Sequence, residues 1–545
     1  MNDKVKMYGK GILSIMNKKF STSLLMTVLI TSLCFGEAQS IFAEENFDEY
    51  SLDTMVVTAT RTEKRDVDVP ASTEIITYED IVDSGSVNAM EAVSKMLGVD
   101  YNTYLPGGSA QTSMTNEINV RGFSYGTLIL VNGNPINLNN TYVIDAIPAE
   151  AIERIEVVKG GGSVLYGSEA QSGVINIITK KKVSNKVRVG FGNYKQQQYN
   201  VAVGNDKLKI NYDLKKWGYV KEARYTAANT YTNLKESSNE NIGIGYNFND
   251  QLSFEYNHLD TEVSYESLKK GRLNSFTDSS NKQDLIQLNY NGNKTKGHAW
   301  FNKTKLDYAG SSARNLFENE SFGADLQQNI ELNNKSLLTV GGVYKREVYN
   351  SKLKKGKPSI GKKARNQMGL FAQLDYKFND KDNVIIGGRG TWTSSESNGQ
   401  SYDNFSTSAQ YIHKFDQDKS FYVSVAESFV MPSFKQMFPS SWVETKPNPD
   451  LKPQEGINYE MGYKEISGNH AWKVALFHMD IKDNISATLN KDDTYEYSNQ
   501  DFKNTGFEAS LRVDASEKFD YDLGLLVHNP KYKWDTDIRN GWHLS

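Results

Sequence analysis

From Lys186 onward one pattern repeats: apolar and polar side chains alternate over segments of about ten residues, and Asn, Asp, Gly and Lys occupy the turns between them. Segment 367–378 shows it, with Phe371 as the one exception. Its apolar set is Met368, Leu370, Ala372, Leu374, Tyr376 and Phe378, and its polar set is Gln367, Gln373, Asp375 and Lys377. Because successive side chains of a strand point to opposite faces, each segment is predicted to be a strand with one apolar face. This part of the chain is therefore predicted to form a large antiparallel sheet.

Such a sheet has two physical interpretations. It is either a soluble sheet with one wet face, or a membrane barrel whose apolar face meets lipid while its polar face lines a lumen. We favour the barrel because the segments have the length of membrane strands and short turns (249–250, 379–382) alternate with longer connections. The longest connections, around 222–240 and 432–455, are predicted to be extracellular. The expected fold of residues 184–545 is an all-β transmembrane antiparallel β-barrel of roughly 18 strands.

The first 43 residues have the features of an export signal. An apolar run extends from Leu24 to Phe35. It is preceded by five lysines, Lys4, Lys6, Lys10, Lys18 and Lys19, and followed by the small residues Ala38, Ser40 and Ala43. A membrane anchor is the alternative, but the run is shorter than the roughly 20 residues that a spanning helix needs. We predict a signal peptide over residues 1–43, cleaved near Ala43.

Charge and cysteine content exclude several classes of function. The formal net charge is -4 and no segment is dominated by a block of Lys and Arg, so nucleic-acid binding is not expected. The only cysteine, Cys34, lies in the signal, which excludes disulfides, Cys-based zinc sites and catalytic thiols from the mature protein. No HExxH, GxSxG or Walker pattern occurs, so we predict neither an enzyme, nor a metal site, nor a permanently bound cofactor.

The region before the barrel has a mixed α and β texture. In 86–98, Val87, Met90, Val93 and Leu97 recur at helical spacing between a capping Ser86 and Gly98. We therefore expect a small α+β domain over residues 63–183, preceded by a segment over 44–62.

Three stretches of this region contain sequence motifs that indicate a function. Residues 53–60 (Asp-Thr-Met-Val-Val-Thr-Ala-Thr) form a β-branched run that can add as a strand to a partner's sheet edge. Residues 119–123 (Asn-Val-Arg-Gly-Phe) precede a strand and a tight turn in 128–136. Residues 147–180 contain two apolar strands around Gly160, Gly161 and Gly162.

Together these stretches resemble the TonB-dependent receptor family of outer-membrane transporters, and 147–180 does so almost residue for residue. The resemblance implies that residues 63–183 are a plug inside the barrel lumen, and that residues 53–59 are the TonB box: Asp53, Thr54, Met55, Val56, Val57, Thr58 and Ala59. It also implies ion pairs between plug and barrel, for which the candidates are Arg121, Glu153, Arg154, Glu156 and Lys159. The family usually has Arg-Gly-Pro where this sequence has Lys159-Gly160-Gly161, and Lys lacks the planar fork of Arg.

The implied partners are the TonB–ExbB–ExbD complex, outer-membrane lipid, the barrel assembly machinery and a transported ligand, an iron chelate. In the barrel, 427–438 and 448–455 resemble the family's extracellular-loop signature. The aromatics Tyr101, Tyr104, Phe434, Phe438 and Trp442 are candidates to stack on the ligand; packing of the loop or of the membrane interface is their alternative role. No histidine lies between Phe429 and Asn448, which disfavours haem. A ferric catecholate siderophore is favoured over cobalamin, with haem third.

Two other classes stay open at this point. A passive porin would need an open lumen, and an adhesin would keep the plug without a TonB box. Barrels of the family have about 22 strands, so we expect this barrel to be C-terminally incomplete, with a naturally smaller barrel as the alternative.

Overall fold

The computed structural model describes residues 55–101, 118–123, 126–139, 142–227, 229–311, 314–354, 361–395, 401–438, 445–446, 448–489, 495–516, 519–532 and 543–544. The predicted signal peptide, Asp53, Thr54, Tyr104 and Trp442 lie outside these residues. Within them, no helix has the length and apolar character to cross a membrane.

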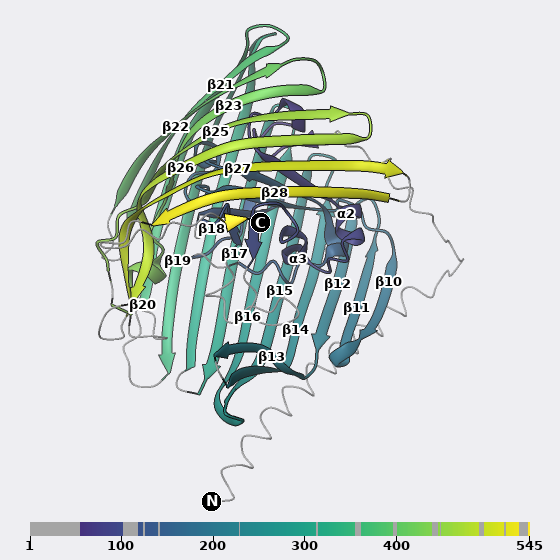
Figure 1. Cartoon of the computed structure of the whole chain (residues 1–545), viewed down its shortest axis with the longest axis vertical. Helices are drawn as coiled ribbons and strands as arrows, with labels where there is room; N and C mark the ends of the chain where they lie inside the picture. The colour runs from purple at the N-terminus through teal and green to yellow at the C-terminus, as the bar shows by residue number, and fades with distance from the viewer. Residues whose placement is uncertain are drawn as a thin grey trace, which may run out of the picture. The chain divides into compact units, whose positions relative to one another are not determined.

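The larger part of the described chain is one sheet whose strands follow one another in chain order (Figure 1). Neighbouring strands are antiparallel, except that the two-residue β24 runs parallel to β27. Without the two-residue strands β24 and β29, the twenty strands of this sheet reduce to eighteen, as expected from the sequence. The strands are β10 (Lys186–Gly192), β11 (Gln196–Gly204), β12 (Leu208–Trp217), β13 (Val220–Ala227), β14 (Thr230–Asn247), β15 (Leu252–Lys269), β16 (Arg272–Asn291), β17 (Thr295–Gly310), β18 (Arg314–Asn333), β19 (Ser336–Lys354), β20 (Gly361–Lys377), β21 (Asp382–Ser395), β22 (Tyr402–Lys414), β23 (Lys419–Val430), β24 (Thr445–Lys446), β25 (Gln454–Ser467), β26 (His470–Leu489), β27 (Tyr495–Ser516), β28 (Phe519–Tyr532) and β29 (His543–Leu544).

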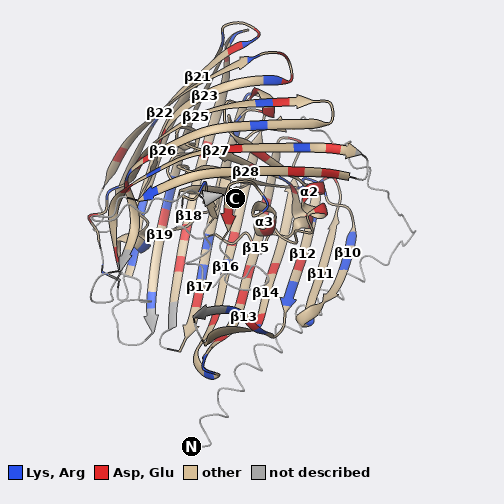
Figure 2. Ribbon diagram, viewed as in Figure 1, with Lys and Arg blue, Asp and Glu red and all other residues tan. Residues whose placement is uncertain are grey.

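The faces of this sheet are inverted relative to a soluble protein. In β20 the apolar set is the exposed one, with Met368 at 51% and Leu370 at 49%, whereas Gln373 and Asp375 are buried. Lysines, arginines and acidic residues recur along the strands (Figure 2), and apolar side chains that face outward without cover are stable only in lipid. The alternation in the sequence therefore marks a transmembrane barrel wall, as predicted.

Phe371, the exception to that alternation, lies on the inner side of β20 and is buried. The guanidinium of Arg61 lies 5.1 Å from its ring centroid and that of Arg389 lies 5.9 Å from it. Its ring is thus a cation–π partner in the lumen.

Asparagine side chains build the short turns. Asn249 Oδ1 accepts hydrogen bonds from the backbone N–H groups of Gln251 and Leu252, and Asn379 does the same for Lys381 and Asp382. These Asx turns explain why Asn punctuates the strands.

One long connection expected from the sequence, 222–240, is instead largely strand. The β13–β14 hairpin occupies it and is stabilised by an apolar cluster of Trp217, Val220, Leu234, Val263 and Tyr265. The polar composition of this stretch made the hairpin difficult to predict from the sequence, because its stability depends on the packing of this cluster and not on a clear alternation of apolar and polar residues.

The N-terminal domain, called the plug below, is built on a five-stranded sheet of order β3-β8-β9-β6-β7. Its elements are β3 (Thr73–Thr77), α2 (Tyr78–Asp83), α3 (Ala89–Val93), β6 (Thr127–Val131), β7 (Asn134–Pro135), β8 (Ile152–Lys159), α4 (Ser163–Tyr166) and β9 (Gly173–Thr179), with a separate pair β4 (Val99–Tyr101) and β5 (Ile118–Val120). Met90, Val93, Ile129, Ile155 and Ile177 belong to its buried core. The helix expected over 86–98 begins after Asn88, whose side chain accepts from the Glu91 N–H, and ends at Val93.

Candidate functional site

Arg121 is the central charged group between the plug and the barrel wall. Its side chain is 1% exposed and lies 2.7 Å from Glu460 and 2.9 Å from Glu508, which belong to β25 and β27. The Arg121 Cζ atom also lies 4.0 Å from the ring centroid of Phe477. A buried guanidinium needs paired carboxylates, and its planar fork can serve both at once. Arg121 therefore fixes the plug to two barrel strands.

Lys159 reaches the same carboxylate from the end of β8. Its Nζ atom lies 3.4 Å from Glu508 and 3.2 Å from Glu74 of the plug. Burial by itself would lower the pKa of Lys159, but the two carboxylates outweigh burial, so the pKa is raised. Lysine thus makes two single-point ion pairs where a guanidinium could make a bidentate one.

The other three predicted plug–barrel residues pair inside the plug. Arg154 contacts Glu153 at 2.6 Å and Glu156 at 2.9 Å. All three lie on β8, which is flanked by β3 and β9 of the plug sheet, and among the described residues no salt bridge joins them to the barrel.

Glu156 instead holds residues 55–60, which we call the coupling segment after the role proposed for it below. Its Oε2 atom accepts from the Val57 N–H (3.0 Å), the Thr58 N–H (2.8 Å) and the Thr58 hydroxyl (2.7 Å). Tyr166 donates to the Thr58 carbonyl at 2.9 Å, and Asn176 donates to the Thr58 hydroxyl at 3.1 Å. Charge-assisted hydrogen bonds of this kind are stronger than neutral ones. The sequence predicted an available strand here, whereas the structure shows a segment bound to β8, α4 and β9.

The start of the segment is also paired as a strand. Met55 and Val56 (β1) form a short hairpin with Arg65 and Lys64 (β2). Val56 is buried. One edge of the proposed recognition strand is therefore already occupied in this structure.

Residues 61–68 then bind the barrel wall through charge, a feature that the sequence reasoning missed. The ion pairs are Arg61 with Asp325 (2.8 Å), Lys64 with Asp375 (2.5 Å), Arg65 with Asp418 (2.7 Å), Asp66 with Lys464 (2.9 Å) and Lys473 (2.6 Å), and Asp68 with Lys414. Burial would raise the pKa of Asp66, but Lys464 and Lys473 outweigh it and hold the pKa well below its usual value. The available signal was the density of charged residues directly after residues 53–60.

The connection between β23 and β25 folds onto the plug. The backbone N–H groups of Phe429 and Met431 donate to the hydroxyls of Ser163 and Ser168, at 3.2 and 3.0 Å. The Phe434 N–H donates to Asn139 at 3.0 Å, at the start of the short helix α5 (Phe434–Met437). Three hydrogen bonds thus tie the end of β23 and this connection to the plug.

Among the candidate aromatics, Phe434 and Phe438 lie together and Tyr101 lies elsewhere. Phe434 is 1% exposed and stacks between Tyr349 and Phe438 at centroid distances of 6.2 and 6.4 Å. Phe438 is half-buried, with the Lys363 Nζ atom 4.6 Å from its ring centroid. Tyr101 packs against the plug core. The Phe438 ring combines partial exposure with a neighbouring cation.

Comparison with known proteins assigns both domains to protein families. Residues 65–174 match the TonB-dependent receptor plug domain, and residues 181–542 match the TonB-dependent receptor-like β-barrel. The vitamin B12 transporter BtuB of Vibrio vulnificus is 24% identical over 484 residues, which cover 85% of this chain and 73% of that protein.

Solved structures with the same fold include siderophore receptors. The ferric enterobactin receptor PfeA of Pseudomonas aeruginosa superposes with a TM-score of 0.64 at 16% identity, covering 89% of this chain and 86% of that one. The siderophore receptor PirA of Acinetobacter baumannii gives 0.62 at 18% identity, covering 86% and 80%. With both domains matched over most of the sequence, this chain belongs to the TonB-dependent receptor family, whose members are transporters of the outer membrane and not enzymes.

Proposed function

We propose that this receptor takes up a ferric siderophore, with a catecholate favoured, and that residues 53–59 are the TonB box read by the TonB–ExbB–ExbD complex. The observation that carries the coupling role is the attachment of Thr58 to Glu156, because it links the recognition strand directly to the plug sheet. Pulling on the segment would then act on β8 rather than on a loose tail. Residues 1–43 are the proposed signal peptide.

The ligand class is supported by the lumen beside α5. A ferric catecholate presents aromatic rings and negative charge, and Phe438 with Lys363 offers an aromatic face with a cation 4.6 Å from its centroid. Arg365 lies 5.1 Å from the Phe434 ring, and its guanidinium pairs with Glu347 at 2.6 Å. PfeA and PirA, described as siderophore receptors, share the fold.

Deletion of residues 53–60 tests the coupling role. Cells expressing the deletion are expected to bind radiolabelled ferric enterobactin at the surface but not to accumulate it, because the energy-coupling strand is gone. An uncoupler should reproduce this result in cells with the intact chain. Uptake that persists in the deletion would argue for a passive porin, and binding without energy-dependent uptake in the intact chain would argue for an adhesin.

Cobalamin is the second candidate, because BtuB is a vitamin B12 transporter and is 24% identical over most of both chains. Titration of the purified receptor with ferric enterobactin and with cyanocobalamin in parallel distinguishes the two ligands. Tighter binding of cyanocobalamin would replace the siderophore proposal.

A further inference from the structure

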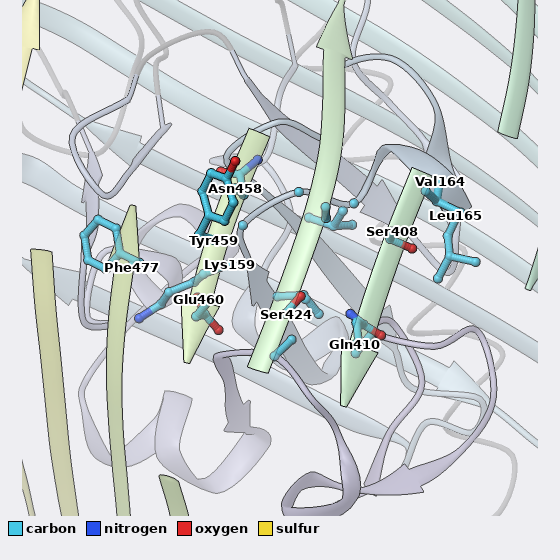
Figure 3. A pocket seen from close by; sticks show the side chains of 18 of the residues that line it. Lys159, Val164, Leu165, Ser408, Gln410, Ser424, Asn458, Tyr459, Glu460 and Phe477 are labelled. Carbon is cyan, nitrogen blue, oxygen red and sulfur yellow. The ribbon is translucent and has the colours of Figure 1, made fainter. Parts of the chain in front are cut away.

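The outward face of the barrel wall is hollowed over the neighbouring strands β15 to β20 (Figure 1). This hollow, called the outer groove below, comprises about 940 Å³ of non-atom space, open surroundings included. A different hollow, inside the lumen, is lined by Lys159 and by wall residues such as Ser408 and Gln410 (Figure 3), and it belongs to the plug–barrel contact described above. The outer groove lies on the opposite side of the wall, which faces lipid.

Small residues form the floor of the outer groove. Gly297 and Ala299 lie on β17, Ala324 lies on β18 and Gly342 lies on β19. Ala299 is the register partner of Ala324, and both glycines are register partners of Leu326, which rises between them and is 60% exposed. Because neighbouring strands lie about 4.8 Å apart, the small residues extend over about 10 Å. The floor therefore has room for a hydrocarbon chain beside Leu326.

Two tyrosines stand at the sides of the groove, and each is oriented by its own contacts. Tyr290 of β16 donates from its hydroxyl to Gln251 at 3.3 Å. Tyr344 of β19 donates to Asn366 at 3.0 Å and packs against Phe322 with the ring centroids 6.2 Å apart. These contacts hold the rings away from the floor, so the groove is already open before an occupant binds.

The position of the groove identifies the chemistry of its occupant. Its lining includes Leu288, Met368 and Leu370, which belong to the exposed apolar face of the wall. One end of the groove lies at Leu252, directly after the short turn at 249–250, and short turns of such barrels are periplasmic. The periplasmic leaflet of an outer membrane consists of phospholipids, whereas lipopolysaccharide occupies the other leaflet. A phospholipid acyl chain therefore has the required polarity and lies on the required side.

We propose that the outer groove binds one acyl chain of a phospholipid from the periplasmic leaflet. Lipid tails are as apolar as the wall, so the hydrophobic effect does not favour the groove over bulk lipid. The gain comes from van der Waals contact, because a chain in the groove touches the floor and both sides at once. The proposal does not depend on which ligand the receptor transports.

The groove lies directly behind an anchor of the N-terminal segment. Asp325 follows Ala324 on β18, points into the lumen and pairs with Arg61 at 2.8 Å. Phe371 follows Leu370 on β20, and its ring centroid lies 5.1 Å from the Arg61 guanidinium. A chain bound outside would pack against the strands that carry both partners of Arg61. Bound phospholipid is therefore expected to stabilise the folded receptor.

Native mass spectrometry tests the site on the whole receptor, purified in detergent, depleted of lipid and titrated with dipalmitoyl phosphatidylethanolamine. Gly297→Leu fills the floor, since a Cβ atom at residue 297 would meet Leu326 at an ordinary 3.4 Å. Gly388→Leu is the matched control, because its Cβ atom would meet Phe405 at the same 3.4 Å, outside the groove. We expect Gly297→Leu to bind the first phospholipid about tenfold more weakly, and Gly388→Leu to bind it as the natural chain does.

A second variant and a second measurement keep the test decisive if Gly297→Leu does not fold. Ala324→Leu fills the same floor from an exposed alanine. Saturating phospholipid should raise the thermal unfolding midpoint of the natural chain and of Gly388→Leu, but not that of Ala324→Leu.

Three outcomes would overturn the proposal. The first is phospholipid binding that neither filling variant weakens. The second is preferential retention of lipid A by the natural chain that is lost on filling, because it would assign the groove to the other leaflet. The third is a dimer of the natural chain that is lost on filling, because it would assign the groove to a second copy of the receptor.

Discussion

Thr58 donates twice to one oxygen of Glu156, through its backbone N–H at 2.8 Å and through its hydroxyl at 2.7 Å. Glu156 has no exposed side-chain area, so these bonds are made out of water. The carboxylate therefore joins the coupling segment to β8, an interior strand of the plug sheet.

Replacing this carboxylate should loosen the segment. Glu156→Gln keeps the shape but replaces charge-assisted hydrogen bonds by neutral ones, which costs about 1.5–3 kcal/mol. Hydrogen exchange of the amides of residues 57–58 should accelerate roughly 10- to 100-fold in the purified receptor. Glu153→Gln on the same strand is the control and should leave these amides unchanged. Equal protection in both variants would show that Glu156 does not hold the segment.

Removing the charge of Arg121 should destabilise the plug–barrel contact. Arg121→Met leaves Glu460 and Glu508 buried without their shared cation, which is expected to cost about 3–5 kcal/mol. Arg188→Met removes a half-exposed partner of Glu150 and should cost less than about 1 kcal/mol. Denaturant unfolding of both variants in detergent checks this ranking, and similar losses in the two would contradict it.

Glu169 is expected to make stability depend on pH. Burial, opposed in part by Lys345 and Arg365 and reinforced by Glu347, raises the pKa of Glu169 from 4.5 to about 7. Because the folded state holds this proton more tightly than the unfolded chain does, stability falls as pH rises from about 4.5 to about 7.

Glu169→Gln removes the ionisable group and should flatten this part of the pH profile. The variant is expected to be more stable than the natural chain above about pH 7 and similar to it near pH 4.5. Unfolding midpoints across this range measure the effect, with the exposed Asp100→Asn as control. A variant with the same slope as the natural chain would assign the pH dependence to other groups.

Variants of the two stacked phenylalanines should distinguish a role in stability from a role in ligand binding. Phe434→Ala empties a buried site and should cost about 3–5 kcal/mol of stability. Phe438→Ala removes a half-buried ring and should cost less stability than Phe434→Ala, and Lys363→Gln should cost little; each should weaken ferric enterobactin binding about tenfold, a loss of about 1.4 kcal/mol. Lys362→Gln, which is exposed and adjacent, is the control. Unchanged affinity in the Phe438 and Lys363 variants would place the ligand elsewhere.

The sequence by itself determined the class of fold. Alternation such as that of Met368 and Leu370 against Gln373 and Asp375 specifies which face each side chain takes, because a strand has a period of two. The turns at Asn249 and Asn379 could also be predicted, because an Asn side chain bonds to backbone N–H groups only two and three residues further on. The plug stretch 147–180 and residues 53–60 identified the family before any contact was known.

Only the tertiary structure decided which charges meet. Glu153, Arg154 and Glu156 looked equivalent to Arg121 and Lys159 as candidates, yet the first three pair within the plug and the last two reach Glu508. The partners of Arg121 and of Thr58 are 387 and 98 residues away in the chain. Periodicity fixes the face of a residue within its own strand, but the register between distant segments depends on the packing of the whole domain, so no local pattern contains it.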